Sequence, residues 1–145
     1  MCTERVSSKG LAVRGATALI LLAIMLFLFS TGLYIRVPLG YGFYLGDIVV
    51  VALVLLFIAK AEQLVAPLSS VVSLALEVES RVVASIVQAV LRLLEIAVAY
   101  YTLRRVFYLL TAPAIGLENS SIAYDAIFLV AACIVAYNLV KSLAR

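Results

Sequence analysis

The chain has 145 residues, of which 66% are hydrophobic and 13% are charged, and its mean hydropathy is +1.21. Soluble domains contain far fewer apolar residues, so we expect an all-α polytopic membrane protein whose single transmembrane helical-bundle domain covers residues 1–145. The net charge of +3 comes from basic residues that are dispersed among apolar segments. This dispersal argues against a nucleic-acid partner and makes the lipid bilayer the expected surroundings.

No histidine occurs in the sequence. Its absence excludes a Ser-His triad, histidine-ligated haem and histidine-containing zinc sites. The two cysteines, Cys2 and Cys133, lie at the amino terminus and inside the last apolar stretch, where they suggest neither a disulfide framework nor a metal site. No glycine-rich phosphate loop is present. We therefore predict no catalytic, cofactor-binding or metal-binding residues, no cofactor and no enzymatic activity.

Two apolar stretches dominate the first half of the chain. The uncharged run after Arg14 predicts a first span over about residues 15–35. A cleaved signal peptide is the alternative, but the run is longer than a usual signal core and no cleavage site follows it. A turn rich in glycine, proline and tyrosine then leads to a second span over about residues 43–64. Asp47 lies in its first turns, where a carboxylate is favoured by the helix dipole.

The third stretch, from Leu68 to Ala112, contains no helix breaker and predicts one long helix. At ~1.5 Å per residue this helix would reach about 65 Å, roughly twice the thickness of a ~30 Å hydrocarbon core. We expect a cytoplasmic or interfacial extension over residues 68–81 and a crossing over about residues 82–103. The alternative is a continuous helix whose polar face lines the bundle interior or a water-filled groove.

Polar residues recur along this third stretch at three- and four-residue steps, which indicates one narrow polar stripe on an apolar helix. The members of the stripe are Ser70, Ser73, Glu77, Arg81, Ser85, Gln88, Arg92 and Glu95. The spacing makes neighbours of Glu77 and Arg81, and of Arg92 and Glu95. Gln88, Arg92 and Glu95 are expected inside the membrane. Their polar groups either find partners on neighbouring helices or line a polar path. The second alternative is considered because ionisable groups at membrane depth often mark pathways.

Pro113 and Gly116 are expected to end the third helix, and a polar connection leads to a fourth span over about residues 122–143. Basic residues near the span ends favour a cytoplasmic location for both termini, since they gather on that side of the membrane. The Asn119-Ser120-Ser121 triplet then lies outside, and as an acceptor sequon it predicts glycosylation at Asn119. We expect a multi-pass protein of the cell membrane.

This topology brings four charged residues to the same outer depth. Asp47 and Asp125 lie at the starts of the second and fourth spans, and Arg104 and Arg105 lie near the end of the third. A partly buried pair of opposite charges stabilises only while both partners are present, because removal of one strands the other. The sequence predicts an outer charge cluster of Asp47, Arg104, Arg105 and Asp125. The alternative is that the four side chains face the headgroup region separately.

One segment resembles a known family. It reads RLLEIAVAYYTLR from Arg92 to Arg104 and is followed by an apolar patch, a short connection and Asp125 at the head of a last span. In this order and spacing it is similar to the second half of the phosphate-starvation-inducible E family, which are small four-span prokaryotic membrane proteins. The similarity covers about the last 55 residues, and the amphipathic stretch before Arg92 departs from the family pattern. The resemblance implies a fold and a location, and no biochemical activity.

Taken together, these features favour a non-enzymatic structural or accessory membrane protein. We expect it to be a homo-oligomer or to join other membrane subunits in a larger complex. The alternative is an oligomeric small channel or carrier with a polar path along Gln88, Arg92 and Glu95. That alternative requires oligomerisation, because four spans from one chain leave little room for a pore.

Overall fold

The computed structural model describes residues 2–31, 36–40, 42–76 and 79–144. Within these ranges the chain is helical apart from one short hairpin, and the structure contains four helices that are each long and apolar enough to cross a membrane. The predicted all-α fold of a four-span membrane protein is confirmed.

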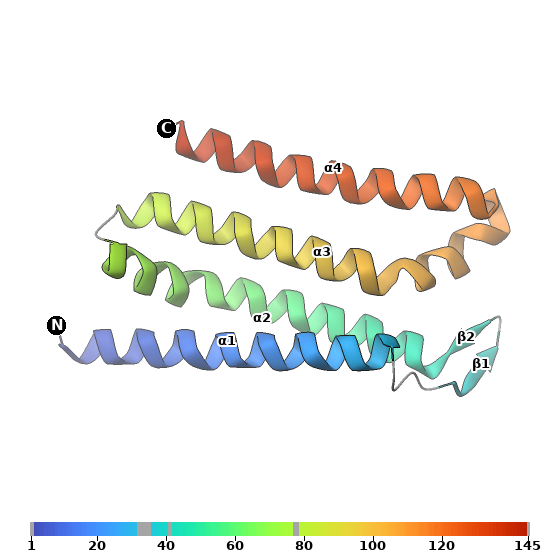
Figure 1. Cartoon of the computed structure of the whole chain (residues 1–145), viewed down its shortest axis with the longest axis horizontal. Helices are drawn as coiled ribbons and strands as arrows, with labels where there is room; N and C mark the ends of the chain where they lie inside the picture. Colours follow the sequence, from blue (N-terminus) through green and yellow to red (C-terminus); the bar gives the residue numbers. More distant parts are fainter. Residues whose placement is uncertain (1, 32–35, 41, 77–78, 145) are drawn as a thin grey trace.

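The four helices lie side by side in a row, in the order of the sequence, and each packs mainly against the next (Figure 1). Their bounds are α1 Cys2–Thr31, α2 Leu45–Leu76, α3 Ser80–Ile115 and α4 Leu117–Leu143. Between α1 and α2, two antiparallel strands form a small hairpin, β1 Pro38–Gly40 and β2 Phe43–Tyr44. Consecutive helices run in opposite directions, so the row has two distinct ends.

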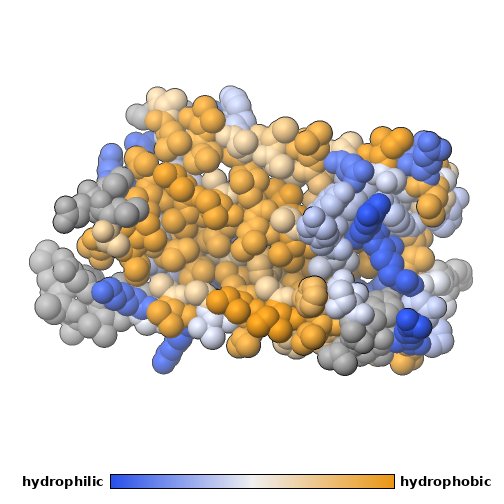
Figure 2. Space-filling view, in the orientation of Figure 1, coloured by the Kyte–Doolittle hydropathy of each residue, from blue (hydrophilic) through white to orange (hydrophobic). Residues whose placement is uncertain are grey.

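Both chain termini lie at one end of the row, which we call the terminal end. The β-hairpin, the start of α2 and the junction of α3 with α4 lie at the opposite end, which we call the hairpin end (Figure 1). Figure 2 shows that apolar residues cover the middle of the visible face and that polar residues gather toward the hairpin end. The junction itself is Gly116, whose φ of 82° is a conformation that glycine adopts without steric cost.

The buried core follows α2, which packs against α1 on one side and α3 on the other. Phe57 and Ala61 of α2 are almost wholly buried. α1 approaches α2 closely at Gly15, where an added Cβ would stand 2.6 Å from Leu64 Cδ1. Small residues permit such close approach between membrane helices. The outer faces of α1 and α4 expose large apolar side chains, as expected when lipid is the solvent.

The predicted unbroken helix from Leu68 to Ala112 is wrong. Residues 68–76 continue α2, which passes through Pro67, and α3 begins only at Ser80. The chain reverses direction before α3, so the predicted single helix is divided between two helices that pack against each other, α2 with 32 residues and α3 with 36 residues. Proline inside α2 is tolerated because neighbouring helices and serine side chains satisfy freed backbone groups in membrane helices.

The reversal also divides the predicted polar stripe between two helices. Ser70 and Ser73 lie on α2, and the members from Arg81 onward lie on α3. Glu79, immediately before α3, has an extended backbone with ψ of 125°, and its carbonyl accepts the Val82 N–H at 3.1 Å. The predicted pairing of Glu77 with Arg81 lies outside the described residues, because Glu77 is not among them.

The remaining helix ends also differ from the expected spans. α1 begins at Cys2, well before residue 15, and residues 32–35 at the end of that predicted span lie outside the described part. α3 continues past Pro113 and ends at Ile115, followed by Gly116 as its C-cap, so of the two residues expected to end this helix only Gly116 does. The expected polar connection is the first turn of α4, where the Asn119 side chain donates a hydrogen bond from Nδ2 to the Ile115 carbonyl at 2.9 Å. Glycosylation at Asn119 stays a prediction.

Candidate functional site

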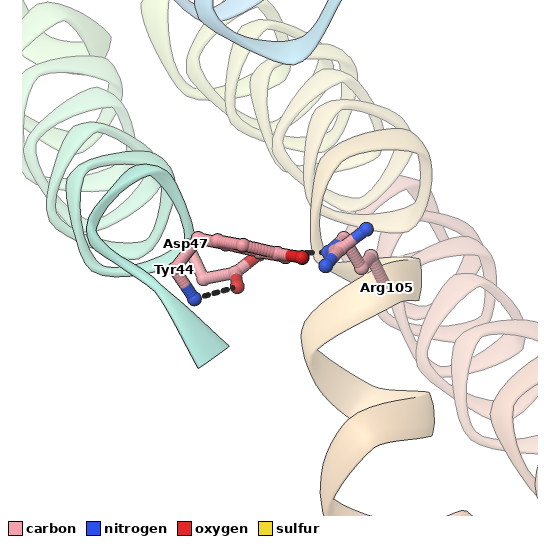
Figure 3. Close-up of polar contacts among 3 residues, drawn as sticks. All are labelled: Tyr44, Asp47 and Arg105. Atoms are coloured by element: carbon pink, nitrogen blue, oxygen red, sulfur yellow. Dashed lines mark hydrogen bonds and ion pairs between the residues drawn. The ribbon is translucent and has the colours of Figure 1, made fainter. Parts of the chain in front are cut away.

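An ion pair links α2 to α3 at the hairpin end (Figure 3). Asp47 Oδ1 lies 3.2 Å from Arg105 Nε, and the Arg105 guanidinium lies over the Tyr44 ring with 5.0 Å between Cζ and the ring centroid. The Asp47 side chain is only 3% exposed, whereas the Arg105 side chain is half exposed. The carboxylate is therefore buried beneath the guanidinium that neutralises it.

The local sequence explains the position of the Asp47 carboxylate. Its second oxygen, Oδ2, accepts the backbone N–H of Tyr44 at 2.9 Å. Tyr44 directly precedes α2, so the contact resembles the part of a capping box in which a side chain in the first turn reaches back to the helix start. The same place suits a negative charge because the helix dipole is positive there. Asp47 thus fixes the first turn of α2 and binds α3 at once.

The neighbouring arginine is linked to α4 through Tyr108. Arg104 Nε donates to Tyr108 Oη at 2.9 Å, and Tyr108 Oη donates to Ser121 Oγ on α4 at 3.1 Å. Successive helical residues point in directions about 100° apart, so two adjacent arginines reach different neighbours. At the hairpin end, polar contacts therefore join α3 to α2 through Arg105 and to α4 through Tyr108.

The predicted outer charge cluster is only partly assembled by direct contacts. Asp47 and Arg105 form an ion pair, but the Asp125 carboxylate accepts a hydrogen bond from Tyr100 Oη at 2.9 Å. In the described part of the chain, no carboxylate lies within 4 Å of the Arg104 guanidinium. Arg104 thus carries a charge that a tyrosine hydroxyl, and no acid, contacts. Whether the four charges act as one cluster stays a prediction.

Tyr124 is the residue at this end that sequence reasoning missed. Its side chain is 1% exposed, and its hydroxyl donates to the Tyr100 carbonyl at 2.6 Å and to the Ala99 carbonyl at 3.2 Å. Its ring centroid lies 4.7 Å from that of Phe128 and 5.0 Å from that of Phe107. A tyrosine near a span end is usually an interface anchor. Here it is the centre of the α3–α4 contact, which only the tertiary structure reveals.

The predicted membrane-depth stripe lies where α3 faces α2. Arg92 Nη2 lies 3.9 Å from Glu62 Oε1 on α2, so the nearest acid is on another helix and the expected neighbour Glu95 is not its ion-pair partner. Glu95 Oε1 is buried and accepts no hydrogen bond from any described residue. An open cavity of about 510 Å³ lies beside these groups, and its wall includes Ser69 of α2 and Gln88 of α3. Two acids and one arginine thus share a single cavity.

The same stripe also touches α4. Gln88 and Arg92 border a second, small cavity of about 70 Å³ whose other wall includes Asn138. Near it, the hydroxyl oxygens of Ser85 and Ser142 lie 2.6 Å apart and form a hydrogen bond between α3 and α4. The stripe therefore faces two helix–helix interfaces, and polar contacts from both α2 and α4 converge on α3.

Glu62 was not singled out from the sequence, although it carries the only acid within ion-pair distance of Arg92 among the described residues. An acidic residue inside an apolar span was the available signal. Within the same described ranges, no three histidine, cysteine, aspartate or glutamate side chains gather where they could hold a metal ion.

Comparison of the chain with protein-family models, with curated proteins and with solved structures finds no match. The resemblance to the phosphate-starvation-inducible E family accordingly stays a prediction.

Proposed function

We propose that this small multi-pass membrane protein has a structural or accessory role, without enzymatic activity, as a homo-oligomer or as a subunit of a larger membrane complex. One observation carries the proposal. The Glu62 and Arg92 side chains form an ion pair, yet they are 61% and 45% exposed in the single chain. A partner subunit that packs over this ion pair would shield both charges from the lipid.

The depth of this pair supports the need for a partner. Arg92 lies 13 residues before Arg105 on α3, or about 20 Å along the axis at ~1.5 Å per residue. If the Asp47–Arg105 pair lies at one surface of a ~30 Å hydrocarbon core, the Glu62–Arg92 pair lies roughly 10 Å inside the other surface. Charged side chains at such depth almost always face a protein interior or a water-filled cavity. A second copy or another subunit supplies that interior.

The orientation belongs to the same proposal. Both termini lie at the terminal end (Figure 1), and the excess of basic residues near that end favours the cytoplasmic side of the cell membrane.

The oligomer is tested by native mass spectrometry of the protein extracted gently into lipid nanodiscs. We expect the natural chain to appear as an oligomer or with defined partners. The double variant Glu62→Leu with Arg92→Leu removes both charges from the exposed face, so it should shift the population toward the single chain. A natural chain that is strictly monomeric at every concentration would reject the proposal.

A matched control is Glu118→Gln, which removes an exposed carboxylate from the first turn of α4. This variant should leave the oligomer distribution unchanged, because Glu118 lies at the hairpin end and far from the Glu62–Arg92 pair. An equal shift in the control would mean that the loss of any charged side chain, and not of the covered pair in particular, weakens the assembly.

A second candidate function, an oligomeric channel or carrier, rests on Glu95. In the part of the chain that the structure describes, its buried Oε1 has no hydrogen-bond partner, and Glu95 lines the cavity of about 510 Å³ that Gln88 and Arg92 also line. A carboxylate in this position would take up a proton or a cation from a polar path.

This second function predicts that Glu95→Gln alters ion or proton flux in liposomes by removing the ionisable group, while the oligomer size stays the same. Flux is measured with a pH-sensitive dye and with ion-selective electrodes. Natural protein that carries neither protons nor any tested ion would exclude the channel.

A further inference from the structure

A third cavity, of about 650 Å³, opens at the hairpin end between the start of α2 and the last turns of α3. Its wall combines two guanidinium groups and two tyrosines with serine, threonine and apolar side chains. The lining residues that matter here are Arg104, Arg105, Tyr101, Tyr108, Leu109 and Leu117. The cavity is therefore cationic in one part and apolar in another.

The charge at this cavity is positive despite the acid in its wall. Asp47 also lines the cavity, but its carboxylate is buried and bound by Arg105 and by the Tyr44 N–H. Arg104 is exposed, and its guanidinium donates from Nε to Tyr108 Oη, while no carboxylate among the described residues lies within ion-pair distance of it. Asp47 cancels one of the two arginines, and Arg104 contributes the remaining charge.

We propose that this cavity binds an anionic phospholipid, with the phosphate at Arg104 and Arg105 and an acyl chain along Leu109 and Leu117. Guanidinium groups match phosphate oxygens in geometry as well as charge. The volume falls within the range of sites that hold small ligands. The tyrosines at the rim are typical of the headgroup level.

The apolar wall argues for a lipid rather than a free anion. A soluble phosphate would use only the arginines and would leave Leu109 and Leu117 facing water. A lipid fills both parts, because its headgroup and its first methylenes are joined. The same chemistry predicts that the headgroup alone binds far more weakly than the intact lipid.

The test reconstitutes the protein in phosphatidylcholine nanodiscs that contain a minor fraction of phosphatidylglycerol. Native mass spectrometry then counts the phosphatidylglycerol molecules that remain bound to each chain, and a titration gives their apparent affinity. We expect one retained phosphatidylglycerol per chain. Arg104→Gln should weaken it roughly tenfold, the size expected when one charge-assisted hydrogen bond is lost.

Two further variants keep the result interpretable. Arg36→Gln removes an exposed arginine outside this cavity and should leave retention unchanged. Ala112→Phe fills the cavity from α3 without touching either arginine and should also release the lipid. The unfolding temperature of each variant shows whether it is still folded. A separate titration with glycerol phosphate measures the headgroup alone.

The proposal is overturned if Arg36→Gln weakens retention as much as Arg104→Gln, because the effect would then be general attraction of the surface for anionic lipid. It is also overturned if folded Ala112→Phe retains the lipid normally. Glycerol phosphate that binds as tightly as phosphatidylglycerol would replace the lipid with a free anion. None of these outcomes depends on the oligomeric state.

Discussion

Replacement of Asp47 by alanine should lower the free energy of unfolding by about 3 kcal/mol. The change removes a buried carboxylate that is bonded to the Tyr44 N–H and to Arg105, and thus a helix cap as well as an ion pair. Loss of a cap costs ~1 kcal/mol, and breaking a buried pair costs ~3 to 5 kcal/mol, of which only part applies here because Arg105 is half exposed. Denaturation in mixed detergent micelles measures the change.

Two companion variants separate the cap from the ion pair. Asp47→Asn keeps an oxygen that can accept the Tyr44 N–H, so it should lose less stability than Asp47→Ala. Asp47→Ala and Arg105→Ala should be non-additive by about 1 to 2 kcal/mol, since the two side chains share one contact. Asp47→Ala and Arg104→Ala should add, because Arg104 is bonded to Tyr108 instead. Equal coupling energies for the Asp47–Arg105 and Asp47–Arg104 pairs would show that Asp47 interacts with both arginines alike, without a specific contact.

Tyr124→Ala should destabilise the protein by about 3 kcal/mol. The side chain is almost wholly buried among the rings of Tyr100, Phe107 and Phe128, so its removal leaves a cavity between α3 and α4. Loss of the whole aromatic ring in a packed interface carries a cost of this size. The free energy of unfolding, again in mixed micelles, provides the measurement.

Tyr124→Phe is the matched variant, because it keeps the ring and removes only the hydroxyl that bonds the carbonyls of Ala99 and Tyr100. Hydrogen bonds between membrane helices average ~0.6 kcal/mol, so the loss should be several times smaller than for alanine. If the two variants were equally destabilised, the hydroxyl and not the ring would hold α4 to α3.

The helical fold was accessible from the sequence because every long segment is apolar enough to exclude any other structure in lipid. The reversal between α2 and α3 was not predicted. Its neighbourhood contains neither glycine nor proline, and the available signal was the group of polar residues Glu77, Glu79, Ser80 and Arg81 between two apolar stretches. Pro67, which does look like a boundary, lies inside α2. The usual helix-breaking residues thus do not mark this turn.

The candidate sites, like the fold, could be predicted from the sequence only in part. Asp47 and Arg105 could be placed at the same end from the sequence, because the direction of each span and the rise per residue give the depth of a side chain. The structure shows these two side chains in contact. The partners of Arg92 and Asp125 depend on how the helices are rotated about their axes, which periodicity along a single helix does not determine. Arg92 forms its ion pair with Glu62, and Asp125 accepts a hydrogen bond from Tyr100.

The arrangement of the helices in one row has a consequence for how the chain is made. Because each helix contacts chiefly the one that precedes it, the binding surface for every new segment already exists when that segment leaves the ribosome. The contacts join helices that follow one another in the chain, so only the connection between two successive helices has to be closed at each step. Assembly can proceed by adding helices in order of synthesis, without waiting for the carboxyl terminus.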